Sequence, residues 1–159
     1  MKKVNILFVC LGNICRSPMA EGVLNSLIKE VKHDNYIEVD SAATHNYHSN
    51  APPDKRACFV ASSHGIDITK QRSRQITDDD FAKFDLIFSM DESIHKNLLR
   101  RSKRSDYKIK QLADYIKELD YSSIPDPYYG DLNDFENTQL VYLDKLRDFL
   151  YRRANLILT

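Results

Sequence analysis

A cysteine and an arginine near the start of the chain have the spacing of an anion-binding loop. Cys10 and Arg16 are separated by five residues, which are Leu11, Gly12, Asn13, Ile14 and Cys15. A loop of this length can wrap a tetrahedral phosphate and offer it backbone N–H groups from Leu11 through Ser17. Arg16 can bind two phosphate oxygens with its forked guanidinium. The same positive surroundings stabilise the thiolate of Cys10, which would lie beneath the phosphorus as a nucleophile.

The sequence also indicates which elements hold this loop. Residues 4–9 contain five apolar residues in six, typical of a short strand buried on both faces. Gly12 and Asn13 tolerate left-handed backbone angles, which suits a tight loop. Ser17 and Pro18 resemble a helix N-cap followed by the first helical residue. We therefore predict a strand, a tight loop and a helix whose positive N-terminal end faces the anion.

Strands and helices alternate along the rest of the chain. Apolar patterns predict helices at 18–32, from Asp54 to Gly65, after Asp91, and from about residue 133, and strands at 36–42, 85–90 and 107–112. Thr77 should cap a short helix that begins with Asp78, Asp79 and Asp80. In the last helix we expect five residues to point inward: Leu140, Leu143, Leu146, Phe149 and Leu150.

This alternation predicts an α/β fold, with one domain over residues 1–159 and a four-stranded parallel sheet covered by helices on both faces. The phosphate-binding loop follows the first strand. Ligands of such sheets bind beyond the carboxyl ends of the strands. Cys10, Ser41 and the loops after the third and fourth strands should meet there.

Composition excludes several other classes of protein. The 23 basic and 23 acidic residues balance, so no global charge favours nucleic acid or a membrane surface. No apolar run approaches the ~18–20 residues of a membrane-spanning helix. The three cysteines do not suggest a disulfide framework, and the five histidines show no metal-ligand spacing. We expect a cytoplasmic protein without membrane insertion, nucleic-acid binding, metal or other cofactor.

Two stretches resemble the low-molecular-weight protein tyrosine phosphatases. The block from Cys10 to Glu21, CLGNICRSPMAE, is similar to that family's signature, and residues 126–130, DPYYG, look like its general-acid loop. The length and the order of the two motifs also fit, so the resemblance covers essentially the whole chain. It implies hydrolysis of phosphotyrosine in proteins through a cysteinyl-phosphate, with inorganic phosphate or vanadate as inhibitors.

The resemblance also implies roles for individual residues. Asp126 would protonate the phenolic leaving group and then activate water. Ser17 would donate a hydrogen bond to the Cys10 sulfur, and Asn13 and Ser41 would support the strained loop. Gln71 stands where the family usually has a histidine in that supporting network. The walls around the substrate ring would be Ile14, Tyr47, where the family often has tryptophan, Tyr128 and Tyr129.

Several residues have simpler interpretations. Cys10 could be an inert buried thiol, and Asp126 before a proline could only initiate a turn. Their occurrence in one chain favours catalysis for both. Cys15 is required by no step of the chemistry, and two interpretations stay open: a small residue that fits the loop, or a redox partner of Cys10. We interpret Cys58 as a core residue.

Four other functions account for the sequence less well than phosphatase activity does. Arsenate reductases of this fold need further cysteines downstream, and none follows Cys58. Protein arginine phosphatases generally carry threonine where this chain has Ile14. A phosphocysteine carrier would not need Arg16 or an acid loop, and a non-catalytic phosphotyrosine-binding module would be expected to have lost Cys10 or Asp126.

Overall fold

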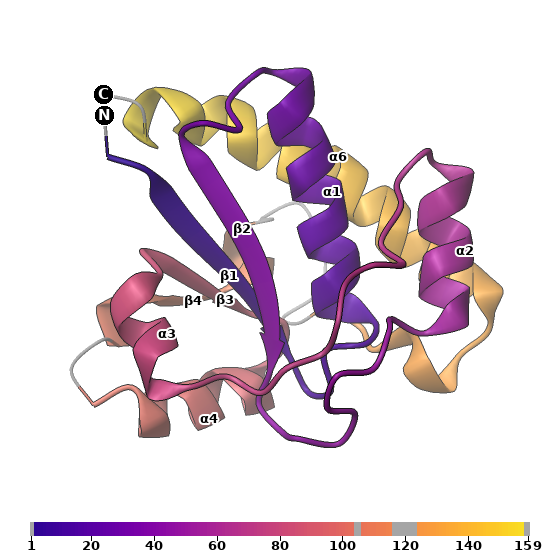
Figure 1. Cartoon of the computed structure of the whole chain (residues 1–159), viewed down its shortest axis with the longest axis horizontal. Helices are drawn as coiled ribbons and strands as arrows, with labels where there is room; N and C mark the ends of the chain where they lie inside the picture. The colour runs from indigo at the N-terminus through magenta and orange to yellow at the C-terminus, as the bar shows by residue number, and fades with distance from the viewer. Residues whose placement is uncertain (1, 104–105, 116–123, 158–159) are drawn as a thin grey trace.

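A central parallel sheet organises the chain. The computed structural model describes residues 2–103, 106–115 and 124–157. Within these residues the sheet has four strands, β1 (Val4–Cys10), β2 (Ile37–Ala43), β3 (Leu86–Ser89) and β4 (Ile109–Gln111), in the order β2-β1-β3-β4. Every neighbouring pair is parallel. The predicted four-stranded parallel sheet is confirmed, and β1, which carries Cys10 at its end, lies between two neighbours (Figure 1).

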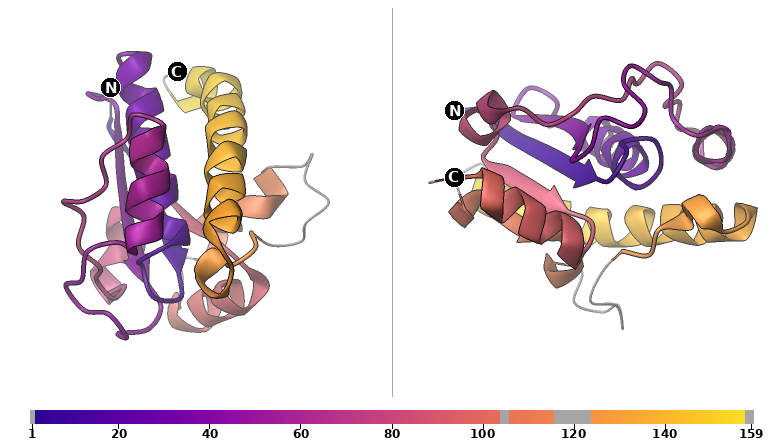
Figure 2. Two further views of the ribbon diagram at one scale, coloured as in Figure 1. Left: turned by 90° about the vertical axis from the view of Figure 1, so that its right-hand side faces the viewer. Right: turned by 90° about the horizontal axis from the view of Figure 1, so that it is seen from below.

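Helices pack on both sides of this sheet. The described helices are α1 (Arg16–Glu30), α2 (Lys55–Ser63), α3 (Asp78–Lys83), α4 (Glu92–Arg101), α5 (Leu112–Tyr115) and α6 (Leu132–Ile157), with short 3-10 turns η1 (Asp106–Lys108) and η2 (Pro127–Tyr129). Helix α1 covers β1 and β2 and packs along α6, whereas α4 packs against β3 and β4 (Figure 2). This is the arrangement that right-handed crossovers between parallel strands produce.

Three predicted helix caps are found. Asp54 accepts a hydrogen bond from the Arg56 amide at 2.8 Å, and Asp91 accepts one from the Ile94 amide at 2.9 Å. Thr77 and Asp80 form a capping box at the start of α3. These caps start α2, α3 and α4 at the predicted residues.

Other expectations about the helices are wrong. Helix α1 begins at Arg16, with Cys15 in the N-cap position, so Ser17 is not its cap. The Ser17 hydroxyl instead contacts the Cys10 sulfur. In α6, Leu140 is 48% exposed, while Phe135 and Tyr142 of that helix are fully buried. The other predicted inward residues of α6 are found, because Leu146, Phe149 and Leu150 are buried and Leu143 packs against the core.

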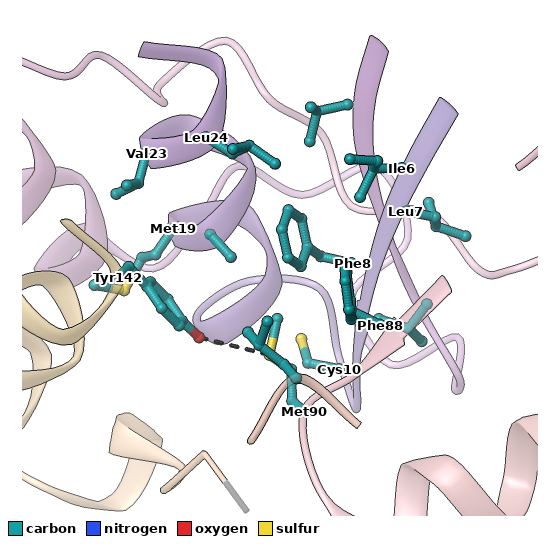
Figure 3. Packing of buried hydrophobic residues seen from close by; sticks show 14 of the residues in the cluster. Ile6, Leu7, Phe8, Cys10, Met19, Val23, Leu24, Phe88, Met90 and Tyr142 are labelled. Atoms are coloured by element: carbon teal, nitrogen blue, oxygen red, sulfur yellow. Dashed lines mark hydrogen bonds between the residues drawn. The ribbon is translucent and has the colours of Figure 1, made fainter. Parts of the chain in front are cut away.

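The core lies between the sheet and the helices α1 and α6. Phe8 and Phe88 stack side by side in the sheet, and Met19 and Leu24 reach them from α1 (Figure 3). Tyr142 of α6 closes this core at the end that carries Cys10, and its hydroxyl donates to the sulfur of Met90 at 3.6 Å. A fully buried side chain of this size contributes roughly 1.5–3 kcal/mol to stability. The loop after β1 thus rests on tightly packed side chains.

None of the described helices is both long enough and apolar enough to cross a lipid bilayer.

Candidate active site

The loop after β1 surrounds the sulfur of Cys10 with hydrogen-bond donors. The backbone N–H of Asn13 donates to Cys10 Sγ at 3.2 Å, and Ser17 Oγ lies 3.0 Å from the same sulfur. The side-chain amide of Asn13 donates to Ser17 Oγ at 2.8 Å, which leaves the hydroxyl proton of Ser17 free to point at sulfur. Cys10 and Ser17 are both buried, so these short contacts act in an environment of low dielectric. The arrangement stabilises a thiolate.

Asn13 holds the loop in its conformation. Its backbone is left-handed, with φ of 57°, which asparagine adopts more readily than most residues. Its Nδ2 also donates to Ser41 Oγ at 2.9 Å, and its Oδ1 accepts from the backbone N–H of Arg74 at 3.1 Å. The side chain therefore links the loop to β2 and to the segment before α3. The sequence did not reveal the contact between Arg74 and Asn13, because almost any residue type can supply a backbone N–H.

Arg16 is fixed by partners from two later segments. Its Nη1 donates to Asp91 Oδ2 at 2.8 Å and to the carbonyl of Ile124 at 3.1 Å. Its Nη2 lies 3.6 Å from Asp126 Oδ2. Burial alone would lower the pKa of this guanidinium, but the negative charges of Cys10, Asp126 and Asp91 outweigh burial and raise the pKa above its usual value. Arg16 stays charged, although it is only 4% exposed.

Asp126 initiates a turn, as the proline after it suggested, and it also faces the anion-binding loop. It caps η2, because its Oδ1 accepts from the backbone N–H of Tyr128 at 3.1 Å. Its other oxygen, Oδ2, faces Arg16. The carboxylate is about one-third exposed, with 34% of the side chain accessible. It is therefore both positioned by its own turn and open to an incoming molecule.

Cys10, Arg16 and Asp126 line one cavity of about 160 Å³. Its described lining is made of residues from the loop, from the segment after β2 and from the Asp126 turn: Cys10, Leu11, Gly12, Ile14, Cys15, Arg16, Tyr47, His48, Asp126, Tyr128 and Tyr129. Tyr47 and Tyr129 are largely exposed and form the rim. Tyr47 stacks on His45, with their ring centroids 5.1 Å apart. The structure therefore brings all the predicted wall residues together.

His48 lines the cavity but was missed in the sequence. A Cβ atom added to Gly12 would lie 3.0 Å from the His48 ring, so the ring packs directly on the loop. A side chain at position 12 would push this ring away. The only signal in the sequence was the position of His48 beside Tyr47, and a single histidine in a loop is otherwise uninformative.

Gln71 lies apart from the Asn13 network. Its Nε2 donates to the carbonyl of Pro18, in the first turn of α1, at 3.1 Å. Its Oε1 is buried and has no hydrogen-bond partner among the described residues. Among the described residues, no hydrogen bond joins Gln71 directly to Asn13 or Ser41. Support of the loop by Gln71 would act through the start of α1 and stays a prediction.

The other cysteines differ from Cys10 in their surroundings. Burial raises the pKa of the Cys15 thiol, and the charges of Asp54 and Cys10 raise it further, so Cys15 is a neutral thiol at neutral pH. Cys58 is only half-buried, and its thiol donates to the carbonyl of Pro53 at 3.7 Å. The predicted core position of Cys58 is thus at the edge of the core. All three cysteines are free thiols in the structure.

Within residues 2–103, 106–115 and 124–157, no group of three or more histidine, cysteine, aspartate or glutamate side chains could hold a metal ion.

A cysteine held by donors at a helix N-terminus, with a buried arginine and a carboxylate at the same cavity, defines a class of enzyme. Such a site fits a phosphatase that uses a thiol nucleophile. The family described as low molecular weight phosphotyrosine protein phosphatase matches residues 5–155. The chain belongs to this family.

Relatives support this assignment over nearly the whole chain. The chain is 45% identical over 135 residues to the low molecular weight phosphotyrosine protein phosphatase of Gallus gallus, covering 83% of this chain and 84% of the relative. It is 43% identical over 149 residues to the protein of the same name from Homo sapiens, covering 92% and 93%. A protein tyrosine phosphatase from Entamoeba histolytica, solved with Hepes in its active site, superposes with a TM-score of 0.91 at 33% identity, covering 96% of this chain and 98% of that one.

Proposed function

We propose that this phosphatase removes phosphate from tyrosine side chains of proteins, with Cys10 as nucleophile, Arg16 as phosphate ligand and Asp126 as general acid and base. The observation that carries the proposal is the shared cavity, in which the Cys10 sulfur and the Asp126 carboxylate flank Arg16. An incoming phosphate can then contact the nucleophile and the proton donor at once.

The reaction has two steps. In the first, the Cys10 thiolate attacks phosphorus, the bond from phosphorus to the phenolic oxygen breaks, and Asp126 gives its proton to that oxygen. In the second, the Asp126 carboxylate takes a proton from water, the water oxygen attacks phosphorus, and the sulfur–phosphorus bond breaks to release phosphate. The hydrogen bond from Ser17 stabilises the thiolate that leaves.

Arg16 and the loop amides would bind the negative oxygens throughout. Asp91 and the Ile124 carbonyl already fix Nη1 of Arg16. The guanidinium is therefore oriented before substrate arrives, and little reorganisation remains for the transition state. Inorganic phosphate and vanadate should occupy the same loop and act as inhibitors.

The cavity walls favour an aromatic substrate. The half-buried Ile14 lines the cavity, and the exposed Tyr47, Tyr128 and Tyr129 stand around its mouth. A phosphorylated phenyl ring can pack against these side chains as its phosphate reaches the loop. Phosphoserine and phosphothreonine are too short to carry phosphate that far, so phosphotyrosine should be the preferred side chain.

Turnover of para-nitrophenyl phosphate and of phosphotyrosine peptides tests these roles. Cys10→Ser should lose nearly all turnover yet still bind vanadate, because the amide loop remains. Asp126→Ala should lower turnover of the peptides by roughly 10²–10⁴-fold, the usual contribution of a general acid. The loss should be smaller for aryl phosphates whose leaving group is already a stable anion. Full activity of Asp126→Ala on the peptides would remove Asp126 from the mechanism.

A further inference from the structure

The turn that carries Asp126 is held from outside by an arginine of α2. Arg56 Nη2 donates to the carbonyl of Tyr128 at 3.0 Å, and Nη1 donates to the carbonyl of Gly130 at 3.1 Å. Tyr128 is the middle residue of η2, and Gly130 directly follows this turn. The same guanidinium therefore binds the turn at two points, 72 and 74 residues away in the sequence.

Arg56 is itself tied to the Cys10 loop through Asp54. Its Nε donates to Asp54 Oδ1 at 3.0 Å and its Nη2 to Oδ2 at 2.9 Å, a two-point contact that uses the fork of the guanidinium. The backbone N–H of Asp54 in turn donates to the carbonyl of Ile14 at 2.8 Å. A continuous series of hydrogen bonds thus runs from the nucleophile loop through Asp54 and Arg56 to the acid turn.

The guanidinium is also fixed by packing. Its central carbon lies 4.5 Å from the ring centroid of Phe135, which is fully buried at the start of α6, and 5.7 Å from that of Tyr128. Contacts of a planar cation with aromatic faces are attractive and restrict the orientation of the cation. A lysine in this place would keep the charge but lose both the stacking and the two-point contacts.

Tyr128 is the residue through which Arg56 reaches the catalytic carboxylate. Its backbone carbonyl accepts from Arg56, and its backbone N–H donates to Asp126 Oδ1 at 3.1 Å. Fixing the Tyr128 backbone therefore fixes the donor that orients Asp126. The Asp126 side chain is one-third exposed and would otherwise depend on a short exposed turn for its position.

We propose that Arg56 is a positioning residue for catalysis, which sets the place of the Asp126 carboxylate relative to the Cys10 loop by joining the two segments. The proposal rests on the proposed role of Asp126 as general acid. Arg56 acts through Asp126 and through backbone groups, and it does not line the substrate cavity. A misplacement of about 1 Å in a catalytic group can cost on the order of 10²-fold in rate.

The proposal predicts a loss that depends on the leaving group. Arg56→Ala and Arg56→Lys should lower kcat/KM by roughly 10–10²-fold for phenyl phosphate and phosphotyrosine, whose leaving groups need a proton. The loss should be only a few-fold for 2,4-dinitrophenyl phosphate, and the inhibition constant of inorganic phosphate should stay unchanged. A matched control is Arg152→Ala, which removes another arginine–aspartate contact, that with Asp148 at 3.1 Å on the exposed side of α6. It should behave like the parent enzyme.

A double-mutant cycle separates positioning from a general effect on the fold. In an Asp126→Ala background, the further change Arg56→Ala should cost little, because the group that Arg56 positions is gone. The proposal would be overturned if the losses in kcat/KM from the two changes multiply. It would also be overturned if Arg56→Ala causes an equal loss for all leaving groups together with weaker inhibition by phosphate. If Arg56→Ala does not fold, the charge-retaining Arg56→Lys carries the test, with its thermal unfolding as a check. Normal kcat/KM of Asp126→Ala on phenyl phosphate would instead reject the acid role itself.

Discussion

Cys15 lies next to Arg16 in the loop and takes no part in the proposed reaction. Peroxide should convert the Cys10 thiolate to a sulfenic acid. The Cys15 sulfur can then attack the Cys10 sulfur, which forms a disulfide and releases water. The charge of Cys10 is one of those that raise the pKa of Cys15, and a neutral sulfenic acid removes that charge. Oxidation of Cys10 therefore lowers the pKa of the Cys15 thiol, while burial, the largest cause of its raised pKa, persists.

We therefore expect peroxide to inactivate the enzyme, bound phosphate to protect it, and dithiothreitol to restore activity. Cys15→Ser should be active but recover poorly after oxidation, since its Cys10 sulfenic acid has no neighbouring thiol and goes on to irreversible states. Cys58→Ser should recover like the parent enzyme. The measurement is the activity that remains after a timed peroxide pulse and the activity that dithiothreitol then restores. Equal recovery of Cys15→Ser and the parent would leave Cys15 as a residue that only fills the loop.

Ile14 bears on which phosphorylated side chain the cavity accepts. It lines the cavity with its apolar side chain, and its carbonyl is held by Asp54. Ile14→Thr places a hydroxyl in the cavity and should shift some preference from phosphotyrosine toward phosphoarginine. Comparing kcat/KM for phosphotyrosine, phosphoserine, phosphothreonine and phosphoarginine in both enzymes tests this. Similar values for all four in the parent enzyme would contradict an aromatic slot.

At the scale of elements, α1 and β2 meet through two carboxyl groups. Glu21 of α1 is buried and forms a hydrogen bond with Asp40 of β2, which also accepts from Arg74 Nη2 at 3.0 Å. Burial and the neighbouring Asp40 raise the pKa of Glu21 from about 4.5 to about 8, although Arg74 opposes this. Glu21 is therefore protonated at neutral pH, and its carboxyl O–H donates a hydrogen bond to Asp40.

This contact makes stability depend on pH. Between about pH 4.5 and 8 the unfolded chain has lost the Glu21 proton while the native protein keeps it, so this group lowers stability as pH rises. Glu21→Gln keeps a donor without a titrating proton. Its stability relative to the parent should rise across this range, by up to a few kcal/mol, and level off above it. Urea unfolding at a series of pH values measures the difference, and parallel curves for the two proteins would show that Glu21 is ionised in the native state.

The elements whose signals are local were predicted well. The apolar run before Cys10 and the caps Asp54 and Asp91 depend on neighbours in sequence, and the structure has the corresponding strand and helix starts. The start of α1 was misplaced because Ser17 has the residue type of a cap but uses its hydroxyl on Cys10. Leu140 was misplaced because Gln139 occupies the buried position beside it, and residue polarity favours leucine over glutamine for that position.

At the scale of the whole molecule, contacts between distant segments escaped prediction. The sequence placed Asp126 beside the loop only by resemblance, and no pattern pointed to Arg56 or to the Arg74 backbone. Asp91 was expected to cap α4, which it does, but its other oxygen also binds Arg16. Such second contacts depend on how the carboxyl ends of β1, β3 and β4 converge, which only the assembled sheet defines.

The partners of Arg16 have a consequence for how the protein is made. Asp91 and the Ile124 carbonyl lie 75 and 108 residues beyond Arg16. A ribosome that builds the chain from its N-terminus releases the cysteine loop long before either partner exists. Contacts of such long sequence separation also form late, because closing long loops costs conformational entropy. A nascent or truncated chain that lacks Asp91 and Ile124 therefore has the nucleophile without a fixed phosphate ligand, and we expect it to show no catalytic turnover.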